Sequence, residues 1–436
     1  MPFRPDGTDA HQVKIRPAAA LMKAESLILS RYQVRVLAIL ALINFVNFAD
    51  RLVVPPLFPL LRNEFDLTSA QLSWLQTLLQ IVLAVGTVPF GLLADRISRT
   101  RIIAAGVVFW SLATFLTGMA GTFAMLLVAR ALVGVGEAAY APAAQSMISG
   151  AFSAEARARA QAVFAAGMLL GGTAGQALGG VVGQAFGWRP AFFFMGIPGL
   201  LLAVFVLRLE EPPRGPRSEL VPFRHLLGVP AYSALILSGV LITFASVAFI
   251  TWGSDFVVRY KGFSLREAGV SLGATILVSS LLGVLAGGSV ADFLQRRFPY
   301  GRILTVALAF LAAAPLVLWA ISTEEKSHVV LAFFAAGFFM SWYHGPVTAV
   351  IHDLTPRRAH ATSVGVYMFV TQLLGGMSGP LVVGKIDDHS DLLLGLKVAV
   401  GVMVAGALSM FLVIYFIRRD GLHHPRLDAF RAEADD

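Results

Sequence analysis

The amino-acid sequence predicts an all-α integral membrane protein whose twelve transmembrane helices form two pseudo-symmetric six-helix bundles. Three observations support this prediction: an apolar composition, apolar runs of membrane-spanning length, and an internal repeat. Hydrophobic residues make up 57% of the 436 residues and charged residues only 14%, whereas soluble domains carry roughly 25% charged residues. A water-soluble fold could not bury this much apolar surface, which excludes the soluble classes.

Twelve apolar runs are long enough to cross a hydrocarbon core, which takes about 20 helical residues. We expect one transmembrane helix in each of the following ranges: 36–59, 71–93, 100–119, 123–149, 158–185, 190–207, 231–256, 268–291, 302–321, 328–352, 360–384 and 392–416. The sequence shows no secretory signal peptide, so we expect the first run to stay in the membrane as helix 1.

The distribution of Lys and Arg predicts the orientation. With the N-terminus inside, both tails and the loops on that side hold a roughly threefold excess of basic residues over the other side, as the positive-inside rule requires. We therefore expect a multi-pass protein of the cell inner (plasma) membrane with both termini cytoplasmic. The net charge of +8 has the same explanation, and no nucleic-acid partner is expected.

Two sequence echoes link span n to span n + 6 and indicate a duplicated six-helix unit. "GLLAD" (Gly91–Asp95) ends span 2 and "GSVAD" (Gly288–Asp292) ends span 8, while "LLGGTAG" (Leu169–Gly175) in span 5 matches "LLGGMSG" (Leu373–Gly379) in span 11. The predicted divisions are an N-terminal tail, an N-terminal bundle, a cytoplasmic linker with room for a short surface helix, a C-terminal bundle and a C-terminal tail: 1–35, 36–208, 209–230, 231–417 and 418–436.

The loop after span 2 carries a signature of glycine, aspartate and arginine. Glycine permits close approach of helices, Asp95 can cap the third helix, and arginines can bond the carbonyl groups at a helix end. We expect a latch on the cytoplasmic side, formed by this loop and its repeat: Gly91, Asp95, Arg96, Arg99, Gly288 and Asp292. The alternative interpretation, a basic topology anchor, is compatible with a latch.

Four ionisable residues lie within the N-terminal spans, at a cost of roughly 2.5–3.5 kcal/mol each on insertion scales. Asp50 lies about 21 Å along helix 1 and Arg130 about 10 Å along the antiparallel helix 4, so both lie at a similar depth and can pair. Arg51 and Glu137 complete the set. We interpret Asp50 and Glu137 as proton-coupling residues, whose protonation would release an arginine. The alternative is a permanently paired network that fixes helices 1 and 4.

Other polar and aromatic residues within the spans are candidates for the wall of a central cavity. Asn44, Asn47 and Arg51 recur at helical spacing and form a polar stripe on span 1. The predicted substrate-binding residues are Asn47, Arg51, Arg130, Tyr140, Trp252, Tyr343, His344 and Tyr367. For Asp255 and Arg259, four residues apart near the outer end of span 7, we expect an interfacial ion pair, with an outer gate as the alternative.

Catalytic and cofactor chemistry finds no support in the sequence. The absence of cysteine excludes disulfides and zinc–thiolate sites. We find no metal cluster, nucleophile set or Walker-type phosphate loop, so we expect no metal, no cofactor and no enzymatic activity. The glycine run 167–183 looks superficially like a phosphate loop, but it lies inside an apolar helix and is typical of helix packing through small residues.

Three segments resemble the Spinster branch of the major facilitator superfamily. They are "NFVNFADR" (Asn44–Arg51), "RALVGVGEAAYAP" (Arg130–Pro142) and "GPVTAVIHDLTPRRAHATSVG" (Gly345–Gly365). The first two also occur loosely in the anion:cation symporter branch, which is the second choice, and the third favours Spinster.

The resemblance implies alternating-access transport of lysolipid- or sphingoid-like amphiphiles, with a site near the membrane midplane between the two halves. It also places Asp50, Arg51, Arg130 and Glu137 at the family's cavity positions. Where that family often has "HLLGD" in helix 11, this chain has "QLLGG", ending at Gly376, which puts the lipid substrate and a helix-11 proton step in question.

The sequence thus predicts a proton-coupled secondary transporter for an anionic or zwitterionic amphiphile, acting as a monomer in the lipid bilayer. The alternative is a proton symporter for a small organic or sugar acid, in which Arg51 and Arg130 would bind the carboxylate directly. A long apolar cavity wall would favour the amphiphile, and a closed polar pocket of a few hundred Å³ would favour the acid. A non-transporting sensor or scaffold is disfavoured, because we find no soluble signalling domain.

Overall fold

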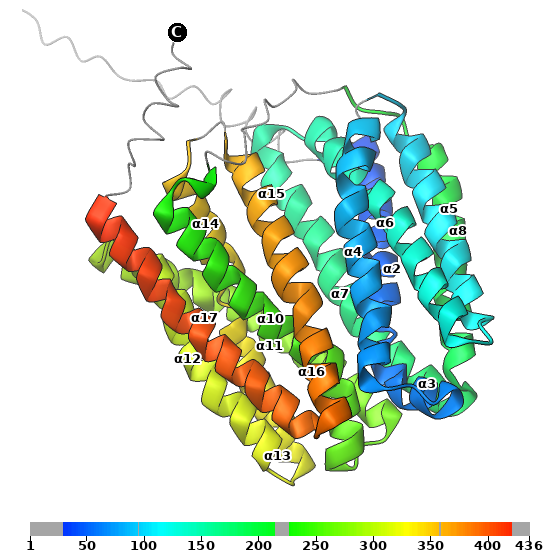
Figure 1. The fold of residues 1–436 in the computed structure, drawn as a ribbon. Helices are drawn as coiled ribbons and strands as arrows, with labels where there is room; N and C mark the ends of the chain where they lie inside the picture. The colour runs from blue at the N-terminus through cyan, green and yellow to red at the C-terminus, as the bar shows by residue number, and fades with distance from the viewer. Residues whose placement is uncertain (1–28, 95, 214–225, 357–358, 421–436) are drawn as a thin grey trace, which may run out of the picture.

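The computed structural model describes residues 29–94, 96–213, 226–356 and 359–420 (Figure 1). Within these ranges the chain is helical without strands, and twelve segments have the length and composition to cross a membrane. The predicted fold class and the twelve spans are therefore confirmed.

Spans 1 to 6 form the N-terminal half. Its helices are α2 (Arg31–Leu52), η1 (Pro55–Leu57), α3 (Phe58–Phe65), α4 (Ser69–Ala94), α5 (Arg99–Gly118), α6 (Phe123–Ala151), α7 (Ala154–Phe186) and α8 (Trp188–Leu207). Spans 7 to 12 form the C-terminal half. Its helices are α10 (Pro230–Lys261), α11 (Leu265–Arg297), α12 (Gly301–Ser322), α13 (Lys326–Met340), α14 (His344–Leu354), α15 (His360–Val370), η3 (Thr371–Gly376), α16 (Met377–His389) and α17 (Leu392–Asp420).

The first span is interrupted. Its helix α2 ends at Leu52, and η1 and α3 continue the span to Phe65. Pro55 and Pro56 explain the interruption, because proline lacks an amide hydrogen and its ring clashes with the preceding turn. The predicted range 36–59 therefore joined two helices with a break between them.

Spans 10 and 11 also depart from the regular helices expected from the sequence. Three residues, 341–343, separate α13 from α14, and η3 forms a wider π-helical turn within span 11. Such irregular turns recur at functional sites, and discontinuous helices line the substrate paths of many transporters.

Glycine stripes pack the same pair of helices in each half. In the N-terminal half they join α7 to α2, and in the C-terminal half they join η3 and α16 to α10. A Cβ at these glycines would overlap a backbone carbonyl of the facing helix; the pairs are Gly171 with Phe45, Gly175 with Ala49, Gly375 with Val240 and Gly379 with Phe244. The predicted packing role of the glycine run and the predicted repeat thus share one structural basis.

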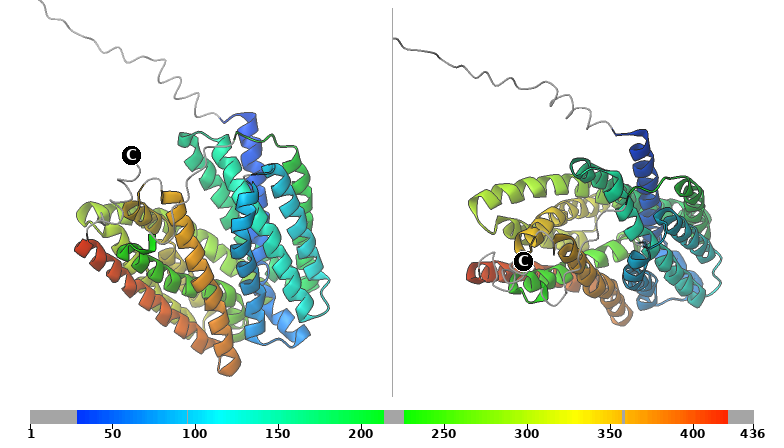
Figure 2. Two further views of the ribbon diagram at one scale, coloured as in Figure 1. Left: turned by 45° about the horizontal axis from the view of Figure 1, so that its top comes forward. Right: turned by 90° about the horizontal axis from the view of Figure 1, so that it is seen from above.

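The two halves stand side by side and converge at one end (Figures 1 and 2). We call the end where α2 begins and α17 finishes the termini end, and the opposite end the far end. In Figure 1 the C-terminal helices lean away from the N-terminal half toward the termini end. The linker between α8 and α10 and both tails lie largely outside the described residues, so their predicted boundaries stay predictions.

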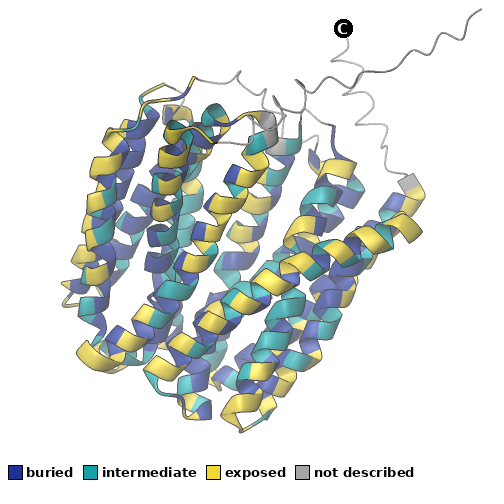
Figure 3. Cartoon of the chain, turned by 180° about the vertical axis from the view of Figure 1, so that it is seen from behind, coloured by how far each residue is buried: buried dark blue, intermediate teal, exposed yellow. Residues whose placement is uncertain are grey.

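Figure 3 shows exposed residues along the helices, and many of the exposed residues are large and apolar. Leu201 on α8 and Leu285 on α11 are examples, with 61% and 65% of their surface exposed. In water such exposed side chains would be unfavourable, whereas in a bilayer they meet acyl chains. The polar groups discussed below lie instead between the helices.

Candidate functional site

Two ion pairs connect α2 and α6 in the interior of the N-terminal half. Arg130 Nη1 lies 3.2 Å from Asp50 Oδ2, and Thr114 of α5 donates to the other carboxylate oxygen of Asp50 at 3.1 Å. Arg51 binds Glu137 through Nε at 2.8 Å and through Nη2 at 2.7 Å. The pairing of helices 1 and 4 expected from residue depth is therefore present.

These pairs differ in their access to solvent. Asp50, Arg130 and Glu137 are each 1% exposed, but the Arg51 side chain retains 17% of its surface. Its guanidinium lies 4.8 Å from the centre of the Phe48 ring. Arg51 is thus the member of the four-residue set whose side chain is accessible to solvent.

The arrangement couples charge to structure. A charge buried without a partner costs several kcal/mol, so the formal charges of the four residues balance only while both carboxyls are ionised. Adding a proton to Glu137 would leave Arg51 without its partner. That change would favour either movement of Arg51 or the arrival of another anion.

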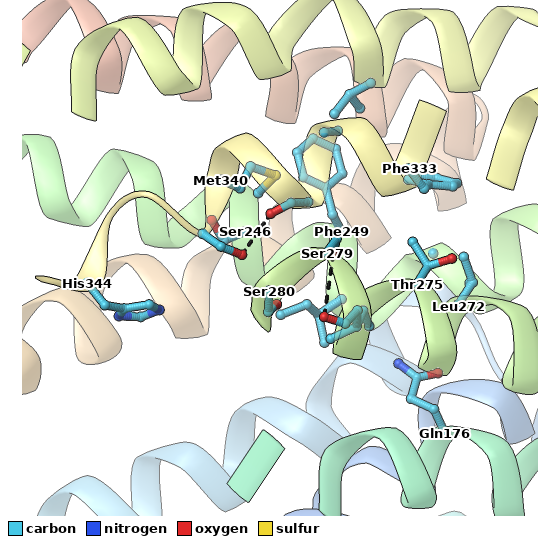
Figure 4. Close-up of a pocket in the computed structure, with 17 residues that line it drawn as sticks. Gln176, Ser246, Phe249, Leu272, Thr275, Ser279, Ser280, Phe333, Met340 and His344 are labelled. Atoms are coloured by element: carbon cyan, nitrogen blue, oxygen red, sulfur yellow. Dashed lines mark hydrogen bonds between the residues drawn. The ribbon is translucent and has the colours of Figure 1, made fainter. Parts of the chain in front are cut away.

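A cavity of about 220 Å³ lies mainly within the C-terminal half (Figure 4). Its walls come from α10, α11, α12 and α13, and Gln176 of α7 contributes from the other half. Apolar side chains such as Phe249, Phe333 and Met340 alternate with hydroxyl groups, including that of Thr275. The lining therefore combines apolar contact area with neutral hydrogen-bonding groups.

His344 stands at one end of this cavity, just after the break between α13 and α14 (Figure 4). The neighbouring Tyr343 makes a hydroxyl–hydroxyl contact with Tyr367 of α15. Tyr367 itself is buried, with 4% exposed. His344 is therefore the member of the predicted aromatic group that lines the cavity, while the two tyrosines lie behind it.

Several predicted substrate contacts lie elsewhere in this conformation. Tyr140 is buried, and its hydroxyl donates to the carbonyl of Leu40 at 3.0 Å. Trp252 is fully buried and donates to the carbonyl of Pro380 at 3.0 Å. In this conformation both aromatic side chains therefore face neighbouring helices rather than the described cavity, and their role as substrate contacts stays a prediction.

The polar stripe predicted on span 1 is divided in the same way. Asn44 donates to the carbonyl of Phe164 on α7 at 2.8 Å, so it holds two helices together. Asn47 is 2% exposed, and its Nδ2 has no hydrogen-bond partner. Arg51 is the stripe member with the most exposed surface in this conformation, and the expectation that the whole stripe faces a cavity stays a prediction.

A charged network at the far end joins the two halves, and the sequence analysis did not identify its full extent. Arg62 of α3 binds both carboxylate oxygens of Asp255 at 3.1 Å. Arg259 binds Asp255 at 3.2 Å and Asp387 of α16 at 2.6 Å. The predicted Asp255–Arg259 pair is present, but Asp255 is fully buried and belongs to a contact between halves.

Further hydrogen bonds close the far end through the backbone. Asp388 accepts from the amides of Ser69 and Ala70 at 2.6 and 2.9 Å, where the first turn of α4 favours an anion. Ser73 donates to the carbonyl of Pro380 at 2.8 Å. The tandem acids 387 and 388 at the end of span 11 were the available sequence signal, since such charges need a partner near a membrane.

At the termini end, Arg99 binds the linker. Its guanidinium is buried and bonds the carbonyl groups of Ser146 and Pro212. The Glu211 carboxylate accepts from Ser98 and, at 3.0 Å, from the Thr100 hydroxyl. Arg99 therefore fastens the start of the linker to the N-terminal half.

Hydrogen bonding also affects the titration of the linker. Partial burial raises the pKa of Glu211, but the bonds from Ser98 and Thr100 outweigh it, and the net pKa is lowered from 4.5. The contribution of this anchor is therefore present at neutral pH.

The other latch residues make few contacts in this conformation. Ser98 caps α5, the role expected for Asp95, which lies outside the described residues. Arg96 and Asp292 are exposed, and a Cβ at Gly288 would meet open space. A Cβ at Gly91 would lie 3.8 Å from Pro142. The latch role of this group stays a prediction.

Comparison with known proteins identifies the family to which the chain is similar. A family model described as Major Facilitator Superfamily matches residues 40–380. Protein spinster of Drosophila melanogaster is 27% identical over 410 residues, covering 87% of this chain and 66% of the fly protein. An MFS-type efflux pump of Mycolicibacterium smegmatis is 27% identical over 404 residues, covering 89% of this chain and 94% of the pump.

A solved structure has the same fold. It is described as a bacterial homologue of the human lysosomal transporter Spinster, in an inward-facing and occupied conformation. The TM-score is 0.81 at 24% identity, over 89% of this chain and 98% of that one. At this identity the likeness shows the fold.

Proposed function

Because the chain belongs to the major facilitator superfamily, with Spinster-like relatives, we propose that it is a proton-coupled transporter of an anionic or zwitterionic amphiphile. In this proposal the two halves rock about a central site and expose it to each side in turn. Asp50 and Glu137 carry the coupled proton, and the substrate is lysolipid- or sphingoid-like.

One observation carries the proton coupling: Glu137 is buried, and its recorded charged partner is the partly exposed Arg51. A protonated Glu137 releases Arg51 toward the solvent side, where an anionic group can take the place of the carboxylate. Proton and anion would thus compete for one arginine through the Arg51–Glu137 pair. Such competition links the two fluxes without any further machinery.

The cavity supports the amphiphile over the small acid. Arginine does not line it, and its walls are mostly apolar with neutral hydroxyl groups. An acyl chain or an apolar base fits such walls, and its charged headgroup would lie toward Arg51. A compact sugar acid would instead need several charged or amide partners around it, so the symporter for organic acids remains the second candidate.

We further propose that the termini end is cytoplasmic, because the excess of basic residues lies there. The far end, sealed by Arg62, Asp255 and Asp387, would then face outward. The described conformation would be closed to the outside, with the halves separated toward the cytoplasm.

The test is flux in proteoliposomes with and without a pH gradient, using a fluorescent NBD-labelled lysophosphatidylcholine as the probe. Wild-type protein should move the probe faster with the gradient, and Glu137→Gln and Asp50→Asn should abolish that acceleration. Glutamine and asparagine keep the size and hydrogen bonding of the acids but not the titration. Equal gradient-driven rates in all three proteins would contradict proton coupling.

The matched control is Glu64→Gln, which removes a carboxyl paired with Arg189 within one half, away from the four-residue set. This variant should keep the response to the gradient. A second arm replaces the probe with radiolabelled glucarate. Gradient-driven uptake of glucarate but not of the lysolipid would show that the substrate is an organic acid and not an amphiphile.

A further inference from the structure

The two interior ion pairs leave several polar atoms without partners. Asn47 Nδ2, Arg130 Nε, Arg130 Nη2 and Glu137 Oε1 are buried, and none has a hydrogen-bond partner in the part of the chain that the structure describes. Buried polar atoms are hydrogen-bonded in the great majority of cases, and each unmade bond costs about 1–3 kcal/mol. Four such atoms on two facing helices therefore require an explanation.

These atoms belong to the two ion pairs or to a residue beside them on α2. Asn47 precedes Asp50 by three residues and Arg51 by four, so on the surface of α2 it neighbours both acidic and basic partners. Asp50 belongs to the pair with Arg130, and Arg51 to the pair with Glu137. Asn47 thus neighbours one member of each pair on α2, and the members on α6, Arg130 and Glu137, carry the other free atoms.

The unpartnered atoms complement each other in chemistry. Asn47 and Arg130 offer N–H donors, and Glu137 Oε1 offers an acceptor. A water molecule accepts up to two hydrogen bonds and donates two, and buried waters make about three. The set therefore has the donor and acceptor composition that holds water, whereas a bare anion would leave Glu137 Oε1 unsatisfied and repelled.

We propose that internal water bridges the two ion pairs and that Asn47 is the positioning residue that holds it. The water accepts from Asn47 Nδ2 and from Arg130 and donates to Glu137 Oε1. This inference rests on the proposed proton coupling and adds a residue and a path to it. It also reassigns Asn47, which the sequence suggested as a substrate contact.

The bridge gives the carboxyls a route for exchange. When Glu137 is protonated, its O–H replaces one of the two N–H donors to the water, and the water turns one of its own O–H groups to the Asp50 carboxylate. The Glu137 O–H bond breaks as the water oxygen gains that proton, a water O–H bond breaks as the Asp50 oxygen gains the second proton, and the water is unchanged. Net, one proton moves from Glu137 to Asp50, so a proton entering beside the partly exposed Arg51 reaches the inner pair.

Among the described residues the helices packed against α2 and α6 supply no further charged side chain to this region, and the nearby Tyr140 donates its hydroxyl to the carbonyl of Leu40. The charged residues of the region are Asp50 and Arg51 from α2 and Arg130 and Glu137 from α6. In the sequence, α4 has no ionisable residue, α7 has none between Ala160 and Phe186, and those of α5 and α8 lie in their first turns. The pH response of this region is therefore that of the four-residue set.

The test compares Asn47→Leu with Asn44→Leu in the flux assay with NBD-labelled lysophosphatidylcholine across a range of pH gradients. Leucine has a similar volume and no donor. Asn44 is a buried asparagine one turn away whose amide is satisfied by a backbone carbonyl, so both variants lose a comparable buried amide. Gradient-driven flux of Asn47→Leu should fall roughly tenfold, the factor for one lost buried hydrogen bond in the limiting step.

Three further readouts make the result decisive. Probe exchange without a gradient should persist in Asn47→Leu, because that amide is not a substrate contact, and Asn47→Ser, which retains a donor, should recover part of the gradient response. A high-resolution cryo-EM map of the wild-type protein should show ordered solvent beside Asn47 Nδ2. If Asn47→Leu and Asn44→Leu respond alike to the gradient, or the map shows no solvent there, the bridge is disproved. If Glu137→Gln also keeps the gradient response, the proton coupling itself fails.

Discussion

The two halves share a packing pattern and differ in chemistry. Glycines of α7 touch the backbone of α2 at Phe45 and Ala49, and glycines of η3 and α16 touch α10 at Val240 and Phe244. These equivalent contacts give a residue-by-residue correspondence between α2 and α10. Counting onward, Asp50 corresponds to Ala245, and Arg51 corresponds to Ser246.

The substitution pattern at these two positions is informative. Ala245 is fully buried, as Asp50 is, but needs no charged partner. Ser246 lines the cavity of the C-terminal half, while Arg51 holds Glu137. One half thus keeps ionised groups at the position where the other keeps neutral ones. The duplicated backbone supplies the scaffold, and the divergent side chains give one half a buried charged network and the other half a cavity with a neutral lining.

The largest effect should come from breaking the inner ion pair. Arg130→Met leaves Asp50 buried without a charged partner, and loss of one partner of a buried pair costs about 3–5 kcal/mol. We expect a marked fall in the melting temperature of the detergent-solubilised protein. The double variant Asp50→Asn/Arg130→Met should recover much of it.

Ala245→Asp applies the same test to the other half. It places a lone carboxyl at the position that corresponds to Asp50, where no arginine is recorded beside it, and should destabilise the protein by a comparable amount. If Ala245→Asp proved neutral, the correspondence between α2 and α10 would be wrong.

Glycine substitutions should affect both halves alike. Gly171→Ala and Gly375→Ala each place a methyl group against a facing carbonyl, and overpacking of this kind costs about 1–3 kcal/mol. The melting temperatures of both variants should fall to a similar degree. Gly401→Ala in α17 is the control, because a Cβ there meets nothing within 4 Å, and it should be neutral or slightly stabilising. Unequal losses would weaken the view of a shared scaffold.

The far-end network should set how often that end opens. Arg62→Gln removes the bidentate contact with Asp255 between the halves, so the closed state loses stability. In a Thr77→Cys background, a membrane-impermeant maleimide should label the buried position about fivefold faster, the shift given by about 1 kcal/mol. The chain has no native cysteine, so labelling reports that position alone.

The control for this measurement is Arg189→Gln, which breaks a pair with Glu64 inside the N-terminal half. Its labelling rate should match that of the parent. Equal labelling of the Arg62→Gln and parent proteins would mean that the network does not seal the far end.

The smallest expected effect concerns the hydrogen bonds of Glu211, which hold the start of the linker to the N-terminal half. The lowered pKa of Glu211 means that its stabilising contribution is complete above about pH 4.5 and is lost as the pH falls through the lowered value. Glu211→Gln should cost about 0.2–1 kcal/mol at pH 7, as exposed charge contacts do, and less at pH 3. Melting temperatures at both pH values test this, and a larger loss at pH 3 would contradict the sign.

How far the sequence predicted this molecule depends on the kind of information needed. Spans follow from composition along the chain, so all twelve were predicted, and the depth of Asp50 and Arg130 along antiparallel helices was enough to suggest their pairing. The direction in which a buried side chain faces depends on its neighbours. Tyr140 and Trp252 were therefore assigned to a cavity, whereas in this conformation they face other helices.

Contacts between the halves were the hardest to predict. Arg62 and Asp387 are more than 300 residues apart in the chain, and they meet only when the far end is closed. The break before His344 did have a local signal, because Pro346 has no amide hydrogen to bond the carbonyl of residue 342 and its ring crowds that carbonyl, but the sequence analysis did not use it. Contacts between the halves depend on the conformation of the whole molecule and not on the sequence of one segment.

The carbonyl of Pro380 accepts hydrogen bonds from both Ser73 and Trp252, one from each half. Dissolved ions screen the attraction between charges at the surface but barely affect a neutral bond in a dry interior. The closed far end therefore has charged contacts that high salt weakens and a neutral hydrogen-bonded contact that salt barely affects. High ionic strength alone should therefore weaken the closed far end without opening it.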